Sequence, residues 1–529
     1  MRRAFSLASG ARVSGKTNAP KIQLSAWETK IFRFLGRVAS VASTTESIEV
    51  RVAGGWVRDK ILQRATGDID IAVRNVTGYQ FASQVQAFAR AKKAEFSKGN
   101  DEEGGISAVG CKEYVPDIST VALIPPNPSM SRHLETATVR LDGQDLDFVQ
   151  LRTEDYATAE AHRVPTSVSA GTPEQDSFRR DFTINALFYN LQTRQVEDFT
   201  CNGLTDLSNG LVRTPLDPKT TLVEDPLRAL RAVRFACRLQ FELHPSLSAA
   251  LSTKVVRDNL QRKVSRERIG TELHQILDSP DVLRGLKMFA KYQLVESVFM
   301  EAFRATTESD TSRYRNGLKT VEQALSLLSH NEKWLLDDEK QKFLRYGAHV
   351  MIYSLLVSKA TRVRKLLHGA LRQPKRLRQD VCYVMRESAA LENVLSSWFT
   401  ARMNNDEIAE KHFWIEIAEI VHSAGHSLWL AIVISSCTKI GEDRLLEEVL
   451  RSGVSSSLCS VSPALDGKRL QAELGIPPGP KVGRALKELI RLQLLQYRRE
   501  ENAAGLHPVQ RRAPSSEVYV EVLKETLSS

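Results

Sequence analysis

Two aspartates lie two positions apart in the segment Asp68-Ile69-Asp70-Ile71-Ala72-Val73, which its alternating apolar residues predict to be a β-strand. Side chains two apart on a strand share a face, so both carboxylates would point the same way. Neighbouring carboxylates repel each other and lose hydration when buried, which favours a cation between them. Because hard carboxylate oxygens suit Mg²⁺, we expect Asp68 and Asp70 to bind magnesium; a solvated strand face is the alternative.

A third carboxylate comes from a predicted β-hairpin whose turn is Asp142-Gly143. Its second strand carries Asp147 between two apolar residues, and Asp145 lies on the same face. Placed beside the first pair, such a carboxylate would complete a cage for two metal ions about 3.5–4 Å apart. That cage would activate a hydroxyl and neutralise a leaving pyrophosphate. Spacing alone does not choose between Asp145 and Asp147.

A glycine pair marks a predicted phosphate-binding turn. Residues 48–52 alternate like a strand, which ends at Gly54-Gly55, and residues 56–63 follow as a short predicted helix. Glycines let backbone N–H groups approach phosphate oxygens closely, and Arg58 would lie one turn into the helix. We therefore expect Gly54, Gly55 and Arg58 to bind phosphate.

A second group of polar residues lies within Ser177–Leu191, where apolar residues at helical spacing predict a helix. On that helix Asp181 and Asn185 would share a face and could hold a ribose by hydrogen bonds. Arg179 and Arg180 would supply positive charge for a triphosphate. The alternative is structural, with Asp181 interacting with the helix dipole and both arginines in solvent.

The pair Asp225 and Arg228 could select a base. Pro226 and the apolar stripe after it predict the start of a helix, on which positions three apart face the same side. A carboxylate beside a guanidinium matches the amino donor and ring-nitrogen acceptor of cytosine and adenine, and it mismatches uracil and guanine. The alternative is an ordinary surface ion pair.

Taken in order, these motifs resemble those of the class II CCA-adding tRNA nucleotidyltransferases. Their amino-acid sequences are similar to those of the eukaryotic branch. The resemblance covers roughly residues 47–299 and includes Gly54-Gly55-Trp56-Val57-Arg58-Asp59, Gly67-Asp68-Ile69-Asp70, Asp147-Phe148-Val149-Gln150-Leu151-Arg152, Arg179-Arg180-Asp181-Phe182-Thr183-Ile184-Asn185 and Glu224-Asp225-Pro226-Leu227-Arg228. It implies Mg²⁺ as cofactor, CTP and ATP as substrates, and the 3′ end of tRNA as acceptor. It also implies that Asp147, not Asp145, is the third carboxylate. The alternatives are a poly(A) polymerase of the same superfamily and a catalytically idle tRNA-binding protein.

The fold class implied by this resemblance is α+β. A polymerase-β-like head with a mixed β-sheet would precede largely helical domains, because strand signals are sparse from about residue 215 onward. We expect a leader (1–25), a nucleotidyltransferase head (26–214), a neck carrying the nucleotide-selecting helix (215–300), a helical body (301–455) and a tRNA-contacting tail (456–529).

Net charge favours a polyanionic partner. The chain of 529 residues has a formal net charge of +10, and its pI is near 9.2. Residues 359–378 are basic and contain no acid, which suits tRNA phosphates; a solvated helix face explains the pattern almost as well. We expect RNA contacts from Lys359, Arg362, Arg376 and, in the tail, Lys481. The oligomeric state stays open.

The remaining composition sets limits on compartment and class. The first 27 residues hold five basic residues, several serines and no acid, which resembles a mitochondrial leader; a disordered basic tail is the alternative, and cytoplasmic and nuclear locations stay open. No apolar run approaches the roughly 18 residues of a membrane span. The cysteines are scattered without a C-x-x-C motif, which argues against a disulfide framework and a structural zinc site.

Overall fold

The computed structural model describes residues 20–42, 46–98, 114–124, 136–155, 167–299, 308–335, 337–357, 359–403, 407–425, 427–441, 443–451, 461–504, 519–520 and 523–524. The chain forms two compact units, Met1–Lys263 and Val264–Ser529. Their division falls inside the predicted neck, and the finer five-part division stays a prediction. Residues 1–19 of the predicted leader lie outside the described part.

A seven-stranded mixed sheet forms the centre of the first unit, with the order β3-β4-β5-β2-β1-β8-β9. The strands are β1 (Glu49–Ala53), β2 (Ile69–Arg74), β3 (Ile118–Ile124), β4 (Thr136–Leu141), β5 (Gln144–Gln150), β8 (Phe188–Asn190) and β9 (Gln195–Glu197). The pairing of β2 with β5 is parallel, and the other pairings in this sheet are antiparallel. The apolar residues of β1 and β2 are buried, so two-residue periodicity predicted both strands correctly.

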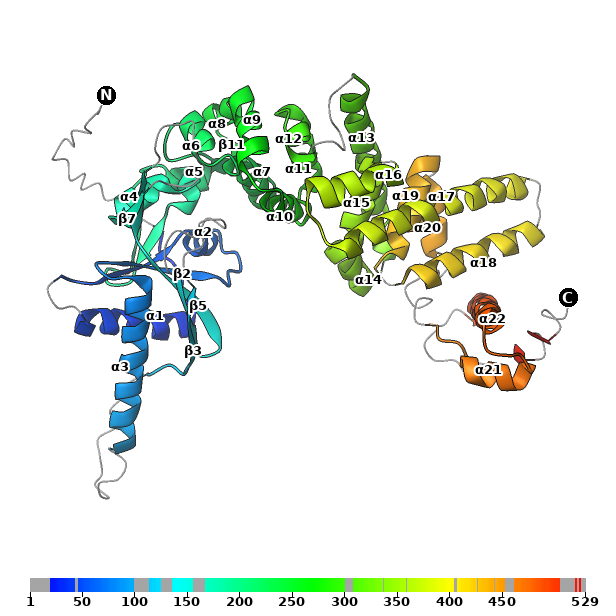
Figure 1. Cartoon of the computed structure of the whole chain (residues 1–529), viewed down its shortest axis with the longest axis horizontal. Coiled ribbons are helices and arrows are strands. Elements are labelled where there is room, and N and C mark those ends of the chain that lie inside the picture. Colours follow the sequence, from blue (N-terminus) through cyan, green and yellow to red (C-terminus); the bar gives the residue numbers. More distant parts are fainter. Residues whose placement is uncertain are drawn as a thin grey trace. The chain divides into compact units, whose positions relative to one another are not determined.

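Helices cover this sheet and continue beyond it (Figure 1). They are α1 (Ala26–Ala42), α2 (Gly55–Ile61), α3 (Gly78–Lys98), α4 (Pro173–Arg179), α5 (Gly203–Asn209), α6 (Pro218–Glu224), α7 (Arg228–Leu239), α8 (Pro245–Leu251) and α9 (Lys254–Lys263). Two short sheets pair β6 (Arg152–Asp155) with β7 (Ser167–Ala170) and β10 (Leu211–Val212) with β11 (Glu242–Leu243). Trp56 packs against Phe32 of α1 and Tyr189 of β8, which ties helices to the sheet.

The predicted helix over Ser177–Leu191 is wrong. Helix α4 begins at a capping box between Thr172 and Gln175 and ends at Arg179. A short 3₁₀ turn, η2 (Thr183–Asn185), and strand β8 follow it. The apolar residues of this segment are buried as expected except Phe178, which is half-buried. Strand β8, however, gains its hydrogen bonds by pairing with β1, a tertiary contact that local periodicity does not reveal.

The second unit consists of helices, which confirms the prediction of a mixed-sheet head followed by a largely helical remainder. Its α-helices are α10 (Arg266–Leu277), α11 (Val282–Lys291), α12 (Val295–Phe299), α13 (Glu308–Asn331), α14 (Asp337–Lys342), α15 (Ala348–Val357), α16 (Ala360–Val363), α17 (Lys375–Met403), α18 (Glu407–Ala424), α19 (Trp429–Ile440), α20 (Asp443–Arg451), α21 (Gly467–Leu474) and α22 (Pro480–Ala504). A 3₁₀ turn, η4 (Glu332–Trp334), and two π-helical segments, η5 (Phe343–Gly347) and η6 (Arg364–Ala370), join some of them. In the part of the chain that the structure describes, no helix combines the length and the apolarity of a membrane span.

Gly78 fixes how closely α3 approaches β5. The residue is buried at the start of α3, and a Cβ atom built on it would lie 2.3 Å from the carbonyl oxygen of Phe148. Backbone cannot yield at that distance without a shift of the strand. Since Phe148 follows Asp147 in β5, close helix packing here also fixes the position of that carboxylate.

We predict that Gly78→Ala destabilises the first unit by about 1–3 kcal/mol, because the added methyl overpacks the contact between α3 and β5. Urea unfolding, with hydrogen-exchange protection of β5 as the local readout, measures the loss. Gly36→Ala on α1 is the matched control, since its Cβ would meet nothing within 4 Å. Equal stability of the two variants would contradict this account of the packing.

Candidate active site

The parallel pairing of β2 with β5 sets Asp70 directly beside Asp147. Directly paired residues of neighbouring strands point to the same face, so the two carboxylates face the same side of the sheet. Thr138 of β4 donates a hydrogen bond to Asp147 Oδ1 at 2.6 Å, which orients that carboxylate. The structure therefore brings together two of the three acidic residues that the sequence singled out.

Asp145 has a different environment from Asp147. Both oxygens of Asp145 accept hydrogen bonds from Arg140, from Nε and from Nη2, each at 2.7 Å. The hydrogen bonds from Arg140 hold the pKa of Asp145 below its ordinary value. Its negative charge is thus already matched by a fixed cation, which makes it a poorer candidate than Asp147 for binding another.

Charges crowd around Asp70. Desolvation at the sheet raises the pKa of its carboxyl, and the negative charges of Asp147 and Asp68 raise it further, while Arg180 opposes the shift. Three carboxylates in one neighbourhood disfavour ionisation unless a cation is added. Carboxylate oxygens are the donor set of a hard divalent cation, so these residues fit such an ion.

Asp68 lies outside the strand in which its sequence pattern placed it. Strand β2 begins at Ile69, so Asp68 is exposed in the loop before it. Among the described residues, only one trio of potential metal ligands brings its ligand atoms within 4.8 Å of one another, and this trio lies in the second unit. The aspartates of the first unit are neighbours that do not meet at a single point, as expected for like charges at a partly exposed edge.

The turn at Gly54 brings Arg180 to this edge. Gly54 follows β1 with a φ of 70°, a conformation that favours glycine. A Cβ atom here would lie 2.8 Å from Arg180 Nη1, so a larger residue would displace the guanidinium. Ala53, the residue before Gly54, is paired with Asp70. The glycine turn, the arginine and the aspartate therefore lie side by side.

A buried aspartate holds the two predicted phosphate-binding arginines. Asp176 accepts hydrogen bonds from Arg179 Nε at 2.8 Å and from Arg180 Nε at 2.9 Å. Burial alone would raise the pKa of Asp176, but the two arginines outweigh it and lower that pKa. The side chains of Arg179 and Arg180 are held by Asp176 but remain 21% and 18% exposed, so both reach solvent. Sequence reasoning missed Asp176, although its spacing of three and four from the arginines was a usable signal.

Arg58 does not lie as its predicted role requires. The residue is 3% exposed. Its guanidinium donates to both carboxylate oxygens of Asp59 and to the side-chain oxygen of Asn185, and it packs over the ring of Phe235. With these partners it links α2 to η2 and α7. The geometry supports a structural role for Arg58, not phosphate binding.

Asp181 and Asn185 are brought together without the predicted helix. Asn185 Nδ2 donates to Asp181 Oδ1 at 3.0 Å, and Arg231 Nε donates to Asp181 Oδ2 at 2.7 Å. Burial raises the pKa of Asp181, but Arg231, Asn185 and Arg228 together lower it to about 2. The carboxylate is therefore ionised and fixed. Arg231 was missed by sequence reasoning, although it follows Arg228 by three positions on α7.

Asp225 and Arg228 flank the break between α6 and α7. Asp225 caps the end of α6, and its Oδ1 accepts from the backbone N–H of Leu227 at 3.3 Å. Arg228 is the first residue of α7 and donates from Nη2 to the backbone carbonyl of Arg179 at 2.6 Å. The two residues thus lie beside the Arg179–Asp181 segment, with their backbones joined by a bond from Arg228 N to Asp225 O of 3.0 Å.

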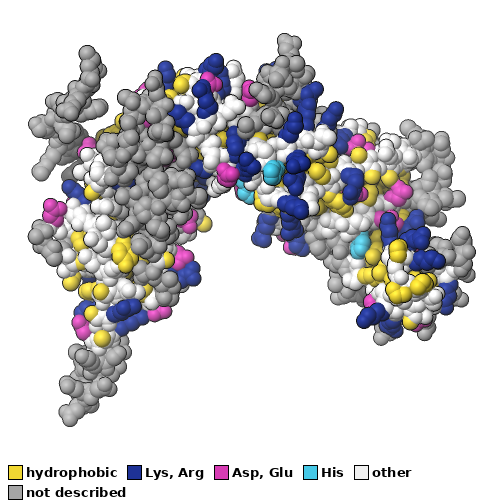
Figure 2. All heavy atoms as spheres, viewed as in Figure 1, with side chains coloured by type: hydrophobic (Ala, Val, Ile, Leu, Met, Phe, Trp, Pro, Cys, Tyr) yellow, Lys and Arg dark blue, Asp and Glu magenta, His cyan; other side chains and the backbone are white. Residues whose placement is uncertain are grey.

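The predicted RNA-binding residues lie in the second unit, where the visible face carries many Lys and Arg side chains (Figure 2). Lys359 and Lys481 are exposed, Arg362 is half-buried, and Arg376 is exposed with Asp380 3.7 Å away. A groove of about 550 Å³ lies along α16 and α17, lined in part by Arg364, Arg378 and Arg386. Of these arginines, Arg386 lies beyond the basic stretch that the sequence indicated.

Comparison with known proteins agrees with this arrangement. Residues 50–213 match the family model described as the poly A polymerase head domain. The chain is 29% identical to the Schizosaccharomyces pombe tRNA nucleotidyltransferase cca2, over 89% of this chain and 95% of that protein. It is 39% identical to the mitochondrial CCA tRNA nucleotidyltransferase of Saccharomyces cerevisiae, over 53% of this chain and 49% of that protein.

The fold matches solved structures along most of the chain. The CCA-adding enzyme of Thermotoga maritima, solved in complex with tRNA, aligns with a TM-score of 0.58 at 18% identity, covering 95% of this chain and 96% of that one. A CCA-adding enzyme in complex with CTP aligns with the same TM-score of 0.58. The ordered motifs, the mixed-sheet head and the curated relatives agree: along most of its length the chain is similar to CCA tRNA nucleotidyltransferases.

Proposed function

We propose that this chain adds C, C and A to the 3′ end of tRNA, taking CTP and ATP as substrates and using no nucleic-acid template. The observation that carries the proposal is the pairing of Asp70 with Asp147 beside Arg180 at the edge of the sheet. An acidic pair next to fixed guanidinium groups suits a triphosphate and its counterion. The relatives named as CCA tRNA nucleotidyltransferases support the same activity.

Enzymes of this nucleotidyltransferase superfamily use divalent metal ions. Here we propose Mg²⁺, held by Asp68 and Asp70, which when bound would neutralise charge on the triphosphate and on the leaving pyrophosphate. Asp147 would assist the attacking 3′ oxygen of the tRNA. That oxygen would form a bond to the α-phosphorus of the nucleotide. The bond from this phosphorus to the oxygen that bridges it to the β-phosphate would break, and pyrophosphate would leave with that oxygen. Positioning and charge neutralisation supply most of the catalysis in such transfers.

Two groups of side chains would hold the phosphates and the ribose of the nucleotide. Arg179 and Arg180, fixed by Asp176, would bind the phosphates. Asp181 and Asn185 would bind the ribose, since Asp181 is ionised and both side chains are held in place. The hydrogen bond from Arg228 to the Arg179 carbonyl joins this binding region to the junction between α6 and α7.

The base would be chosen at that junction. Asp225 would accept a hydrogen bond from the amino group of cytosine or adenine, and Arg228 would donate to N3 of cytosine or N1 of adenine. Uracil and guanine would place a carbonyl against the carboxylate and an N–H against the guanidinium. Each unmatched buried group costs about 1–3 kcal/mol, which is enough for selection without a template.

The proposed partners and location follow from the same reasoning. The basic groove along α16 and α17 and the exposed Lys359, Arg376 and Lys481 would contact tRNA phosphates. Arg362 is half-buried and would contribute only if its guanidinium reaches the surface. We propose a mitochondrial location, supported by yeast relatives named as mitochondrial and by the basic leader; cytoplasmic and nuclear locations are further proposals.

A primer-extension assay tests the activity. Purified protein and a tRNA that ends at its discriminator base should give two added residues with CTP alone and three with CTP and ATP together. Long A tails with ATP alone would instead identify a poly(A) polymerase. A protein that binds this tRNA and extends it under none of the three conditions would be catalytically idle.

We predict that Asp70→Asn and Asp147→Asn each lower kcat/KM for CTP at least about 100-fold, because each removes negative charge where the metal and the attacking oxygen would lie. Single-turnover extension measures the loss. Asp145→Asn, on the same strand and face but paired with Arg140, is the matched control and should keep nearly full activity. An Asp145→Asn defect as large as that of Asp147→Asn would show that the third carboxylate has been wrongly assigned.

We also predict that Asp225→Ala lowers the preference for CTP over UTP by about 5- to 150-fold, because the repulsion between carboxylate and uracil carbonyl is lost. Steady-state kcat/KM for all four nucleotides measures the change. Arg238→Ala, an exposed position on α7, the helix that begins at Arg228, should leave the preference unaltered. Unchanged selectivity in Asp225→Ala would refute the pairing model and leave the proposed activity intact.

A further inference from the structure

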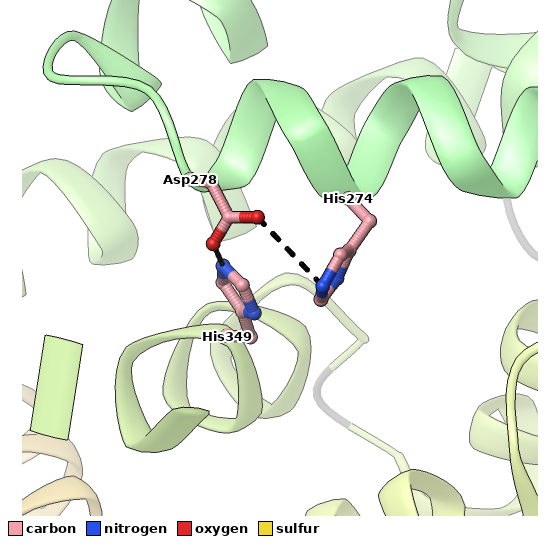
Figure 3. A group of neighbouring side chains, drawn as sticks. All are labelled: His274, Asp278 and His349. Atoms are coloured by element: carbon pink, nitrogen blue, oxygen red, sulfur yellow. Dashed lines mark ion pairs between the residues drawn. The ribbon is translucent and has the colours of Figure 1, made fainter. Parts of the chain in front are cut away.

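Two histidines and an aspartate meet inside the second unit, far along the chain from the nucleotide-binding motifs. His274 lies on α10 and Asp278 caps the end of that helix, while His349 comes from α15. One ligand atom from each side chain lies within 4.8 Å of the others. Figure 3 shows the Asp278 carboxylate facing both imidazole rings, with one oxygen toward each, and the two rings pack edge to face with centroids 4.7 Å apart.

The distances suit a bound metal ion. His349 Nε2 lies 3.1 Å from one oxygen of Asp278, and His274 Nε2 lies 3.7 Å from the other. Ligands about 2.0–2.2 Å from a tetrahedral Zn²⁺ ion lie about 3.3–3.6 Å from one another. The two observed distances run to different oxygens of Asp278, and one ligand atom from each side chain lies within 4.8 Å of the others, so side-chain rotations would have to bring the three ligand atoms closer around one ion.

His349 is a buried polar side chain without adequate partners. It is 1% exposed, and among the described residues neither ring nitrogen makes a hydrogen bond of good geometry, although Nε2 lies 3.1 Å from an oxygen of Asp278. A buried group of this kind calls for an explanation, and a metal ion supplies one.

Solvent can reach the cluster from one side, because the side chains of His274 and Asp278 are each 48% exposed. Tyr353 lies one helical turn after His349, and among the described residues its buried hydroxyl also has no hydrogen-bond partner.

We propose that His274, Asp278 and His349 bind one Zn²⁺ ion that links α10 to α15, with water completing its coordination. Imidazole nitrogens favour Zn²⁺ over Mg²⁺, which distinguishes this donor set from the all-oxygen set of the first unit. The scattered cysteines argued against a structural zinc site, but this one uses no sulfur. Its residues come from separate helices, so no short sequence motif reveals it.

The test measures metal binding by the full-length protein. All proteins carry Asp70→Asn, and the buffer contains excess Mg²⁺, so that the carboxylates of the first unit do not contribute. Zn²⁺ binding is measured by calorimetry, and Co²⁺ titration gives an independent visible absorption spectrum that reports on its ligands. His274→Ala and Asp278→Asn change exposed ligands and should fold. His368→Ala, an exposed histidine on η6, is the matched control.

We expect one Zn²⁺ ion per chain, binding at least about 10-fold more weakly in His274→Ala and Asp278→Asn than in the His368→Ala control. Zn²⁺ should also raise the melting temperature of the control and not that of the two ligand variants. If no ion binds, the cluster consists only of the contacts between Asp278 and the two histidines, and the proposal is overturned. Equal Zn²⁺ binding by all variants would overturn it as well, by placing the ion elsewhere.

Discussion

The repulsion between Asp70 and Asp147 is the constraint on which the first unit depends. The parallel register of β2 and β5 sets these residues side by side, and Asp68 adds a third negative charge nearby. Such an arrangement is unfavourable by itself. Its surroundings offset it in part: Arg180 lies against the glycine turn after β1, and Thr138 donates to Asp147. The sheet edge therefore has excess negative charge in a fixed geometry, which is what a nucleotide-bound divalent cation requires.

A series of ion pairs and hydrogen bonds connects the carboxylates of the sheet to the region proposed to choose the base. Asp176 holds Arg179 and Arg180, the Arg179 carbonyl accepts from Arg228, and Asp181 accepts from Arg231. Removing one member would leave a buried charge without its partner, a larger loss than the pair contributes when intact. Phosphate binding and base choice thus share one network, although their residues come from two separate segments of sequence.

Much of this could be predicted from residue types and two-residue periodicity. Strands β2 and β5 place alternate residues on one face, so the D-x-D pattern and Asp147 were recognisable before any pairing was known. The helix predicted over Ser177–Leu191 was wrong because β8 is stabilised by pairing with β1. The burial of Arg58 was not predicted because its partners Asn185 and Phe235 are distant in sequence. Arg231 and the His274–Asp278–His349 cluster depend in the same way on tertiary contacts.

The measurement that tests the central claim most directly is the position of a bound cation in the first unit. Crystals grown with Mn²⁺ and CTP would locate the ion by its anomalous scattering. The account predicts a peak in contact with carboxylate oxygens of Asp70 and the CTP phosphates, on the face that Asp147 shares. A nucleotide-bound ion held by other residues, with Asp70 and Asp147 turned away from it, would contradict the account.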